Sequence, residues 1–190
     1  MLAAIRKTKD GYEATYERIL PHPPEKVWRA VSDGEHIASW FTRNDLDPEA
    51  GGRYVVHHDH VGLSAEEEVL RYDPPRLFEH TWGKGEWGGP GHDTVCWEVH
   101  PHDEGTRLVL TFRFRDLTNA PGSLAGWHIW LDVLETVLSG RPREEHEPPH
   151  GTFEDGRFTI TAEGKGVWAR NPAMMDAYAR HLNEQVPAEA

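Results

Sequence analysis

Apolar and polar positions alternate along six stretches of the chain, and this pattern predicts β-strands. Successive side chains of a strand point to opposite faces of a sheet, so alternation gives each strand one apolar and one polar face. The Asp-Pro-Pro sequence at 73–75 predicts a turn, and the glycine-rich segment 83–91 predicts a hairpin loop. The predicted strands cover residues 12–20, 54–58, 66–72, 77–82, 94–100 and 107–115.

A second pattern, with apolar residues three or four positions apart, predicts helices. Two short helices follow the first strand at 25–32 and 35–41, and Pro24 suits the first turn of the earlier one. One long helix is predicted over 122–138, where Trp127, Trp130, Leu131, Leu134 and Leu138 share a face. This order of elements predicts an α+β fold in which a curved antiparallel sheet wraps around the long C-terminal helix.

The same patterns divide the chain into three parts. We expect a flexible N-terminal arm over 1–11, a main domain over 12–139 and a C-terminal extension over 140–190. In the extension, the Pro- and Glu-rich segment 141–151 predicts a linker, 157–161 a short strand, and 172–184 a helix. Three roles stay open for the extension: packing on the main domain, capping a pocket, or joining a partner in a homodimer.

The net charge of the chain limits the classes of partner that it can bind. With 20 basic and 32 acidic side chains the formal net charge is −12, which disfavours nucleic acid and anionic membrane surfaces as partners. The single cysteine, Cys96, rules out an intramolecular disulfide and fits a reducing compartment. The sequence contains no signal peptide pattern and no apolar run of roughly 20 residues that would insert into a membrane. We therefore expect a cytoplasmic protein.

Several sequence motifs occur together in a characteristic order. They are contained in YERILPHPPEKVWRAVSDGEHIASWF, GGRY, EVLRYDPPRLFEHTW, TVCWEVHPHDEGTRLVLTF and AGWHIWLDVLETVL. Over residues 12–138 the chain thereby resembles the START-like (SRPBCC) superfamily of helix-grip proteins, and within it the branch named after the activator of the heat-shock-protein-90 ATPase. The resemblance implies a cavity between the curved sheet and the last helix. Relatives bind lipids, hormones or other hydrophobic molecules, some branches are cyclases or hydroxylase subunits, and others act on a chaperone.

Aromatic residues are the strongest candidates for a binding site. The chain has eight Trp, six Phe and five Tyr, more large rings than a close-packed core of this size needs. We expect them to line an apolar cavity between the sheet and the long helix, the usual form of a small-molecule site. Tyr54, His80, Trp82 and Trp127 are the best-placed contacts. The full candidate set is Trp40, Phe41, Tyr54, Val56, Phe78, His80, Trp82, Trp97, Phe112, Trp127 and Trp130.

His80 stands out in this set because alternation places it on the pocket face beside Phe78 and Trp82. It is a satisfied core residue, a hydrogen-bonding partner for a ligand, or an acid/base group. The acidic run Glu66–Glu67–Glu68 is read as a solvated edge, although alternation sends Glu67 to the opposite face from its neighbours. A buried Glu67 together with His80 would form a general acid/base pair.

Two further clusters have simpler interpretations. His58 and His60 share a strand face and, with His57 and Asp59, form half of a zinc or copper site, which His80, His100 or His102 would have to complete. We interpret the cluster as a His-rich strand end and assign no metal ligand. Alternation places Cys96 on the outer face of the sheet, which favours an inert structural or surface thiol over a nucleophile. Arg107 and Arg113 also lie off the apolar face.

Three hypotheses for the function follow. The first is non-catalytic binding of a hydrophobic or aromatic small molecule, without a cofactor. The second is a protein-interaction role, in which the chain acts on a chaperone as a co-chaperone-like factor. The third is a small hydrolase or cyclase that uses His80 with a carboxylate. An open cavity favours the first hypothesis, whereas a filled interior favours the second.

Overall fold

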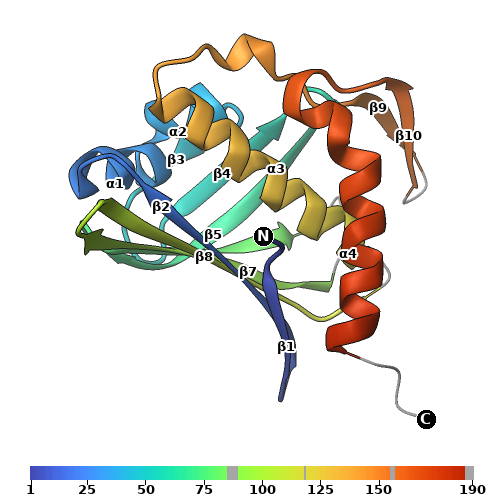
Figure 1. Cartoon of the computed structure of the whole chain (residues 1–190), viewed down its shortest axis with the longest axis horizontal. Helices are drawn as coiled ribbons and strands as arrows, with labels where there is room; N and C mark the ends of the chain where they lie inside the picture. The colour runs from blue at the N-terminus through green and yellow to red at the C-terminus, as the bar shows by residue number, and fades with distance from the viewer. Residues whose placement is uncertain (85–89, 118, 155–156, 187–190) are drawn as a thin grey trace.

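The computed structural model describes residues 1–84, 90–117, 119–154 and 157–186. Within these residues an antiparallel sheet of eight strands has the order β1-β2-β8-β7-β6-β5-β4-β3, and α3 crosses one face of it (Figure 1). The strands are β1 (Ala4–Thr8), β2 (Gly11–Leu20), β3 (Asn44–Leu46), β4 (Arg53–His58), β5 (Leu63–Asp73), β6 (Leu77–Lys84), β7 (Pro90–His102) and β8 (Gly105–Phe114). This arrangement confirms the predicted α+β helix-grip fold.

The helices also follow the sequence pattern closely. They are α1 (Pro24–Ser32), α2 (Gly34–Trp40), α3 (Ala120–Leu138) and α4 (Asn171–Gln185), with short 3-10 turns η1 (Arg143–Glu145) and η2 (Gly166–Arg170). Pro24 occupies the first turn of α1, and the Asp33 side chain caps α2 by accepting a hydrogen bond of 3.1 Å from the backbone N–H of His36. None of the described helices is long and apolar enough to cross a bilayer.

The N-terminal segment differs from the prediction. Residues 1–11 are not a flexible arm, because β1 pairs with β2 along five residues, from Ala4 opposite Thr15 to Thr8 opposite Gly11. Ala3 and Ile5 are buried, which supplies the apolar contacts that hold this edge strand. The short strand β3 also had no counterpart in the sequence pattern. The predicted hairpin loop over 83–91 falls largely on residues 85–89, outside the described residues.

The C-terminal extension packs on the main domain, the first of the three roles left open. Helix α4 lies against α3 and β1 (Figure 1). The Tyr178 hydroxyl accepts a hydrogen bond of 3.0 Å from the backbone N–H of Ala3 and lies 2.9 Å from Nδ1 of His128 on α3. In η2, the ring of Trp168 packs edge-on against Trp130, with centroids 4.9 Å apart. A homodimer through this extension stays a prediction.

The segment predicted as a linker is also held in place. It contains η1 and the first two residues of β9 (His150–Glu154), which pairs with β10 (Arg157–Ala162). Arg143 donates a hydrogen bond of 3.1 Å to the carbonyl of Ala38 on α2, and its guanidinium lies 6.0 Å from the ring centroid of Trp130. The Pro- and Glu-rich composition predicted a solvated spacer, but these contacts tie the segment to the rim between α2 and α3.

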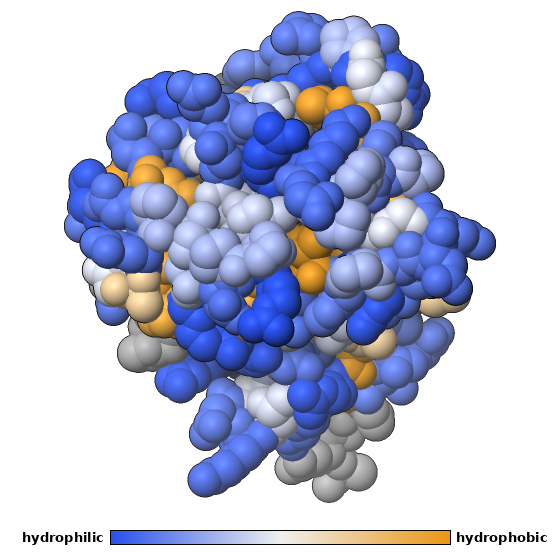
Figure 2. Space-filling model, turned by 90° about the vertical axis from the view of Figure 1, so that its left-hand side faces the viewer, coloured by the Kyte–Doolittle hydropathy of each residue, from blue (hydrophilic) through white to orange (hydrophobic). Residues whose placement is uncertain are grey.

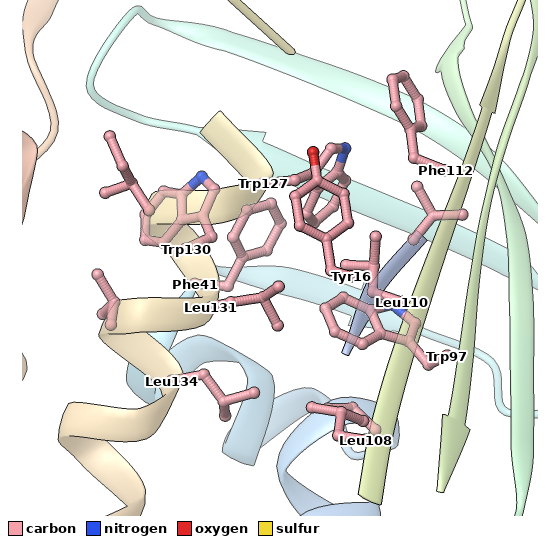
Figure 3. Close-up of a cluster of buried hydrophobic side chains, with 14 of the residues drawn as sticks. Tyr16, Phe41, Trp97, Leu108, Leu110, Phe112, Trp127, Trp130, Leu131 and Leu134 are labelled. Atoms are coloured by element: carbon pink, nitrogen blue, oxygen red, sulfur yellow. The ribbon is translucent and has the colours of Figure 1, made fainter. Parts of the chain in front are cut away.

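The two faces of the sheet carry different chemistry. The inner face meets α3, and aromatic and aliphatic side chains fill the space between them (Figure 3). On the outer face, Glu13 pairs with Arg6 and Arg113, and Glu79 pairs with Arg113 and Arg71. Both carboxylates are largely buried beneath the arginines that contact them. The predicted placement of Arg113 off the apolar face is therefore confirmed.

Candidate functional site

The predicted aromatic residues do come together on the inner face. Phe41, which follows α2, lies between the two tryptophans of α3, with ring centroids 4.7 Å from Trp130 and 5.8 Å from Trp127 (Figure 3). Trp82 on β6 extends the cluster, because its centroid is 4.8 Å from that of Trp127. All of the eleven candidate residues are buried except Trp82, which is partly exposed. The strand and helix periods alone were sufficient to find this cluster.

The open cavity expected from the sequence is wrong. A cavity of only about 10 Å³ lies within the cluster, because rings from α2, α3 and the sheet interlock edge to face. Trp40, for example, packs edge-on against Trp97 and Trp130, at centroid distances of 5.9 and 6.4 Å. Two lining residues were missed from the sequence, Val31 and Ile37. The lining consists of Val31, Ile37, Trp40, Phe41, Tyr54, Phe78, His80, Trp97 and Trp127.

Four candidate residues therefore lie inside the cluster but away from this small cavity. Val56 is completely buried on β4, and Phe112 stacks on Phe114 of the same strand at a centroid distance of 5.1 Å. Trp82 and Trp130 pack against Phe41, and Trp130 also contacts Trp168 of the C-terminal extension. The structure thus divides the predicted set into residues that line the cavity and residues that support those rings.

His80 presents a hydrogen-bond acceptor to the cluster. Its Nδ1 lies 2.7 Å from the carbonyl oxygen of Thr81, which can only accept, so Nδ1 carries the proton. The lone pair is then on Nε2, which has no hydrogen-bond partner among the described residues. Burial lowers the pKa of His80 to about 4, so the ring is neutral at pH 7.

Tyr54 presents the complementary donor next to it. Its ring packs edge-on against His80, with centroids 4.8 Å apart, and 3% of the residue is exposed. Burial raises the pKa of Tyr54, and nearby Glu67 raises it further, so the phenol keeps its proton at neutral pH. In the part of the chain that the structure describes, no residue forms a hydrogen bond with this hydroxyl, and Tyr54 lines the small cavity. The residues that line the cavity therefore include a protonated phenol and a neutral imidazole in ring contact.

Glu67 lies on the same face but has a different contact. It is 2% exposed, whereas Glu66 and Glu68 are exposed, so the solvated edge predicted for this run is wrong at its central residue. The Thr81 hydroxyl donates a hydrogen bond of 2.6 Å to Oε2 of Glu67. Alternation on β5 explains the inward position, and Tyr54 stands directly opposite Glu67 in the register of β4 and β5.

The His-rich strand end is arranged for hydrogen bonding. His57 lies between Asp45, at 3.0 Å from Nε2, and the hydroxyl of Ser64, at 2.9 Å from Nδ1. β4 ends at His58, so His60 lies in the following turn and not on the strand face predicted for it. The two rings are nevertheless 5.8 Å apart, and burial lowers the pKa of both to about 4. Within the described ranges, no three His, Cys, Asp or Glu side chains form a group that suits a metal ion.

Cys96 lies on the outer face of the sheet, as alternation predicts, but it is buried rather than at the surface. Arg71 covers it, with Nη2 at 3.8 Å from Sγ. Burial, together with the nearby carboxylates of Glu79 and Glu98, raises the pKa of the thiol to about 11. A thiol in this state is a weak nucleophile at neutral pH.

Comparison with known proteins assigns the chain to a family. Residues 21–139 match the family described as Activator of Hsp90 ATPase homolog 1-like protein. The chain belongs to this family. The match covers both short helices, the sheet from β3 to β8 and α3, and therefore includes every residue that lines the cavity. No curated protein matches the chain.

Solved structures share the fold. MLL2253 from Mesorhizobium loti is 27% identical, with a TM-score of 0.59 over 67% of this chain and 97% of that one. CalU16 from Micromonospora echinospora is 19% identical, with a TM-score of 0.73 over 96% of this chain and 95% of its own. EF2215 from Enterococcus faecalis, a conserved protein of unknown function, is 15% identical, with a TM-score of 0.67 over 96% and 91%. The last two similarities extend into the C-terminal extension, which is therefore part of a recurring fold.

Proposed function

We propose that the protein binds a small hydrophobic or aromatic molecule that carries one polar group, and that the polar group meets Tyr54 and His80. The observation that carries this proposal is the pair of unsatisfied polar groups at the cavity, the Tyr54 hydroxyl and Nε2 of His80. A few polar groups at an otherwise apolar pocket are the usual means of orienting a bound small molecule. A ligand hydroxyl donates to Nε2 and accepts from Tyr54 at the same time.

The size of the cavity determines how binding proceeds. A volume of about 10 Å³ accommodates at most one water molecule, so the apolar part of a ligand has to displace side chains. Trp82 is partly exposed, and Arg143 and Trp168 cover Trp130, so movement of these side chains would open the cluster towards solvent. Because only molecules in the open conformation bind the ligand, the apparent affinity is the intrinsic affinity multiplied by their fraction.

A matched ligand pair tests this proposal. p-Cresol and toluene have similar shapes, but only p-cresol carries the hydroxyl that suits Tyr54 and His80. In titrations followed by 1H–15N NMR of the indole N–H groups, we expect p-cresol to bind about tenfold more tightly than toluene, since one satisfied hydrogen bond contributes about 1–1.5 kcal/mol. The resonances of Trp40, Trp97 and Trp127 are expected to shift most.

A matched pair of variants separates the site from the rest of the molecule. His80→Phe keeps a flat ring among Tyr54, Phe78 and Trp82 but removes the acceptor, so it is expected to bind the two ligands equally. Arg53→Gln alters an exposed ion pair with Glu66 and is expected to leave the preference for p-cresol unchanged. An absence of saturable shifts in the wild-type protein would remove the proposal.

A second candidate function is a protein-interaction role as a co-chaperone-like factor. The filled interior favours it, because a surface that binds a partner needs no internal space. The family match to activators of the Hsp90 ATPase is consistent with it. The chain would have to increase the ATPase rate of an Hsp90-type chaperone in a saturable way. Stimulation that survives His80→Phe, combined with no ligand-induced shifts, would favour this function over small-molecule binding.

A further inference from the structure

A second concave site lies outside the aromatic interior, between α1, α2 and the end of α3. The groove has a volume of about 290 Å³. Its floor is formed by apolar side chains of α1, α2 and α3: Ala30, Trp40, Leu134, Val137 and Leu138. The face that carries α1 and α2 is otherwise mainly hydrophilic, with hydrophobic atoms visible only in small hollows (Figure 2).

The rim of this groove is positively charged, in contrast to the chain as a whole. Lys26 and Arg29 stand one turn apart on α1, and His36 and Ser39 complete the polar lining. None of the described residues that line the groove is acidic, although the chain has 32 acidic and 20 basic side chains. Asp33 contacts the rim through His36, whose Nδ1 lies 2.8 Å from the Asp33 carboxylate.

The two cations are not neutralised by carboxylates. Lys26 donates a hydrogen bond of 2.6 Å to the backbone carbonyl of Leu138 at the end of α3, which leaves two of its three N–H groups for another acceptor. Arg29 has no ion pair among the described residues. Elsewhere arginines such as Arg53 and Arg76 contact a carboxylate. The rim therefore has cationic N–H groups without a carboxylate partner, next to the apolar side chains of the groove.

We propose that this groove binds a small amphipathic carboxylate, such as a medium-chain fatty acid. The carboxylate contacts Lys26 and Arg29, and the alkyl chain covers Leu134, Val137 and Trp40. The size of the groove favours this occupant over a peptide. About 290 Å³ lies at the lower limit of small-molecule sites, whereas protein partners usually bury about 800 Å² on each side. Of the described residues, Trp40 alone lines both this groove and the small cavity of the aromatic interior.

Decanoate, below the concentration at which it forms micelles, is the probe for this site. Isothermal titration is expected to give saturable binding to the wild-type protein and at least tenfold weaker binding of decanol, which lacks the charge. The double variant Lys26→Gln, Arg29→Gln is expected to lose that tenfold preference, while Arg53→Gln keeps it. In 1H–13C NMR, the Val137 and Leu138 methyl groups should shift, and the indole N–H of Trp127 should not.

Three results would overturn this inference. The first is equal affinity of decanoate and decanol for the wild-type protein, because the cations would then play no part. The second is a shift at Trp127 larger than that at Val137, which would move the ligand to the aromatic interior. The third is tighter binding at the same methyl groups by an acidic peptide of alternating aspartate and leucine. Val137→Trp, which fills the groove, is expected to abolish decanoate binding without affecting p-cresol.

Discussion

Buried polar side chains on the two faces of the sheet differ in how many hydrogen-bond partners the protein supplies. On the outer face, Glu79 of β6 is 8% exposed and bonds two arginines, Arg113 and Arg71. On the inner face, the next residue of that strand, His80, is 2% exposed and uses only one of its two ring nitrogens. Both residues are buried, and one step along the strand separates them. Burial alone therefore does not explain why a polar residue stands at either position.

The difference separates a structural role from a recognition role. The outer carboxylates are satisfied by side chains of neighbouring strands, so their contribution lies within the fold itself. The inner donor and acceptor, Tyr54 and His80, are held close together by the register of β4, β5 and β6 but are not satisfied by the protein. Polar groups that the fold orients, but that form no hydrogen bond within the protein, are consistent with a hydrogen-bonding ligand.

We expect the largest loss of stability when an aromatic ring of the inner face is removed. Trp127→Ala deletes an indole that contacts Phe41, Trp82, Trp97 and Phe112. Large-to-small changes of this kind cost about 3–5 kcal/mol of unfolding free energy. Urea denaturation followed by circular dichroism measures the loss. A loss below about 1 kcal/mol would mean that the interior is loosely packed around this ring.

A smaller effect is expected from acid, and again it arises on the inner face. The pKa of His80 is about 4 in the folded protein and about 6.5 in the unfolded chain, so between these values the unfolded state binds more protons. The stability that this neutral imidazole contributes is therefore fully present above pH 6.5. It is lost as the pH drops towards 4, which lowers the free energy of unfolding by about 3 kcal/mol. His58 and His60, whose pKa values are also lowered to about 4, act in the same direction.

Urea unfolding at pH 7 and pH 5 measures this dependence. His80→Phe removes one titrating group and is expected to flatten the curve between these two pH values. Arg53→Gln removes no group that titrates between these pH values and should leave the slope as it is in the wild-type protein. An unchanged slope in the His80 variant would show that the imidazole is not buried in its neutral form.

The outer face should respond to salt instead. Glu79→Gln keeps the shape of the side chain but removes the charge between Arg71 and Arg113, whose side chains are 54% and 43% exposed. Exposure of the arginines limits the expected loss to about 1–2 kcal/mol, and 1 M NaCl should reduce it further. A loss that does not depend on salt would assign the effect to packing over Cys96.

The smallest effect is expected at Cys96 itself. Because its thiol is buried and its pKa is raised to about 11, iodoacetamide at pH 8 should leave the folded protein unmodified. The same reagent in 8 M urea should label it completely, as mass spectrometry would show. Rapid labelling of the folded protein would place the thiol at the surface. The sequence had left this possibility open beside a structural thiol.

Much of this architecture was accessible from the sequence because two periods dominate it. Alternation on β6 placed Phe78, His80 and Trp82 on one face, and the helical period of α3 placed Trp127 and Trp130 against them. What the sequence did not reveal depends on contacts between distant segments. The edge strand β1 needs Tyr178 of α4 to hold Ala3, and the packing of α2 rings decides how much space remains.

The candidate site illustrates the same limit. The sequence identified Tyr54 and His80 separately, but their proximity depends on the register of three strands, which includes a bulge between Val69 and Arg71. The groove beside α1 had no sequence signal, since Lys26 and Arg29 look like ordinary surface cations until α3 ends beside them. Cavity volume is the least predictable quantity, because it is a small difference between large packed volumes.

The central claim is that His80 serves recognition rather than stability, and one comparison tests it directly. The wild-type protein and His80→Phe are each unfolded in urea at pH 7 and titrated with p-cresol. We expect the variant to be at least as stable as the wild type, because a buried imidazole is replaced by an apolar ring, and we expect its p-cresol affinity to fall about tenfold. A variant that loses about 2 kcal/mol or more and still binds p-cresol normally would contradict the account.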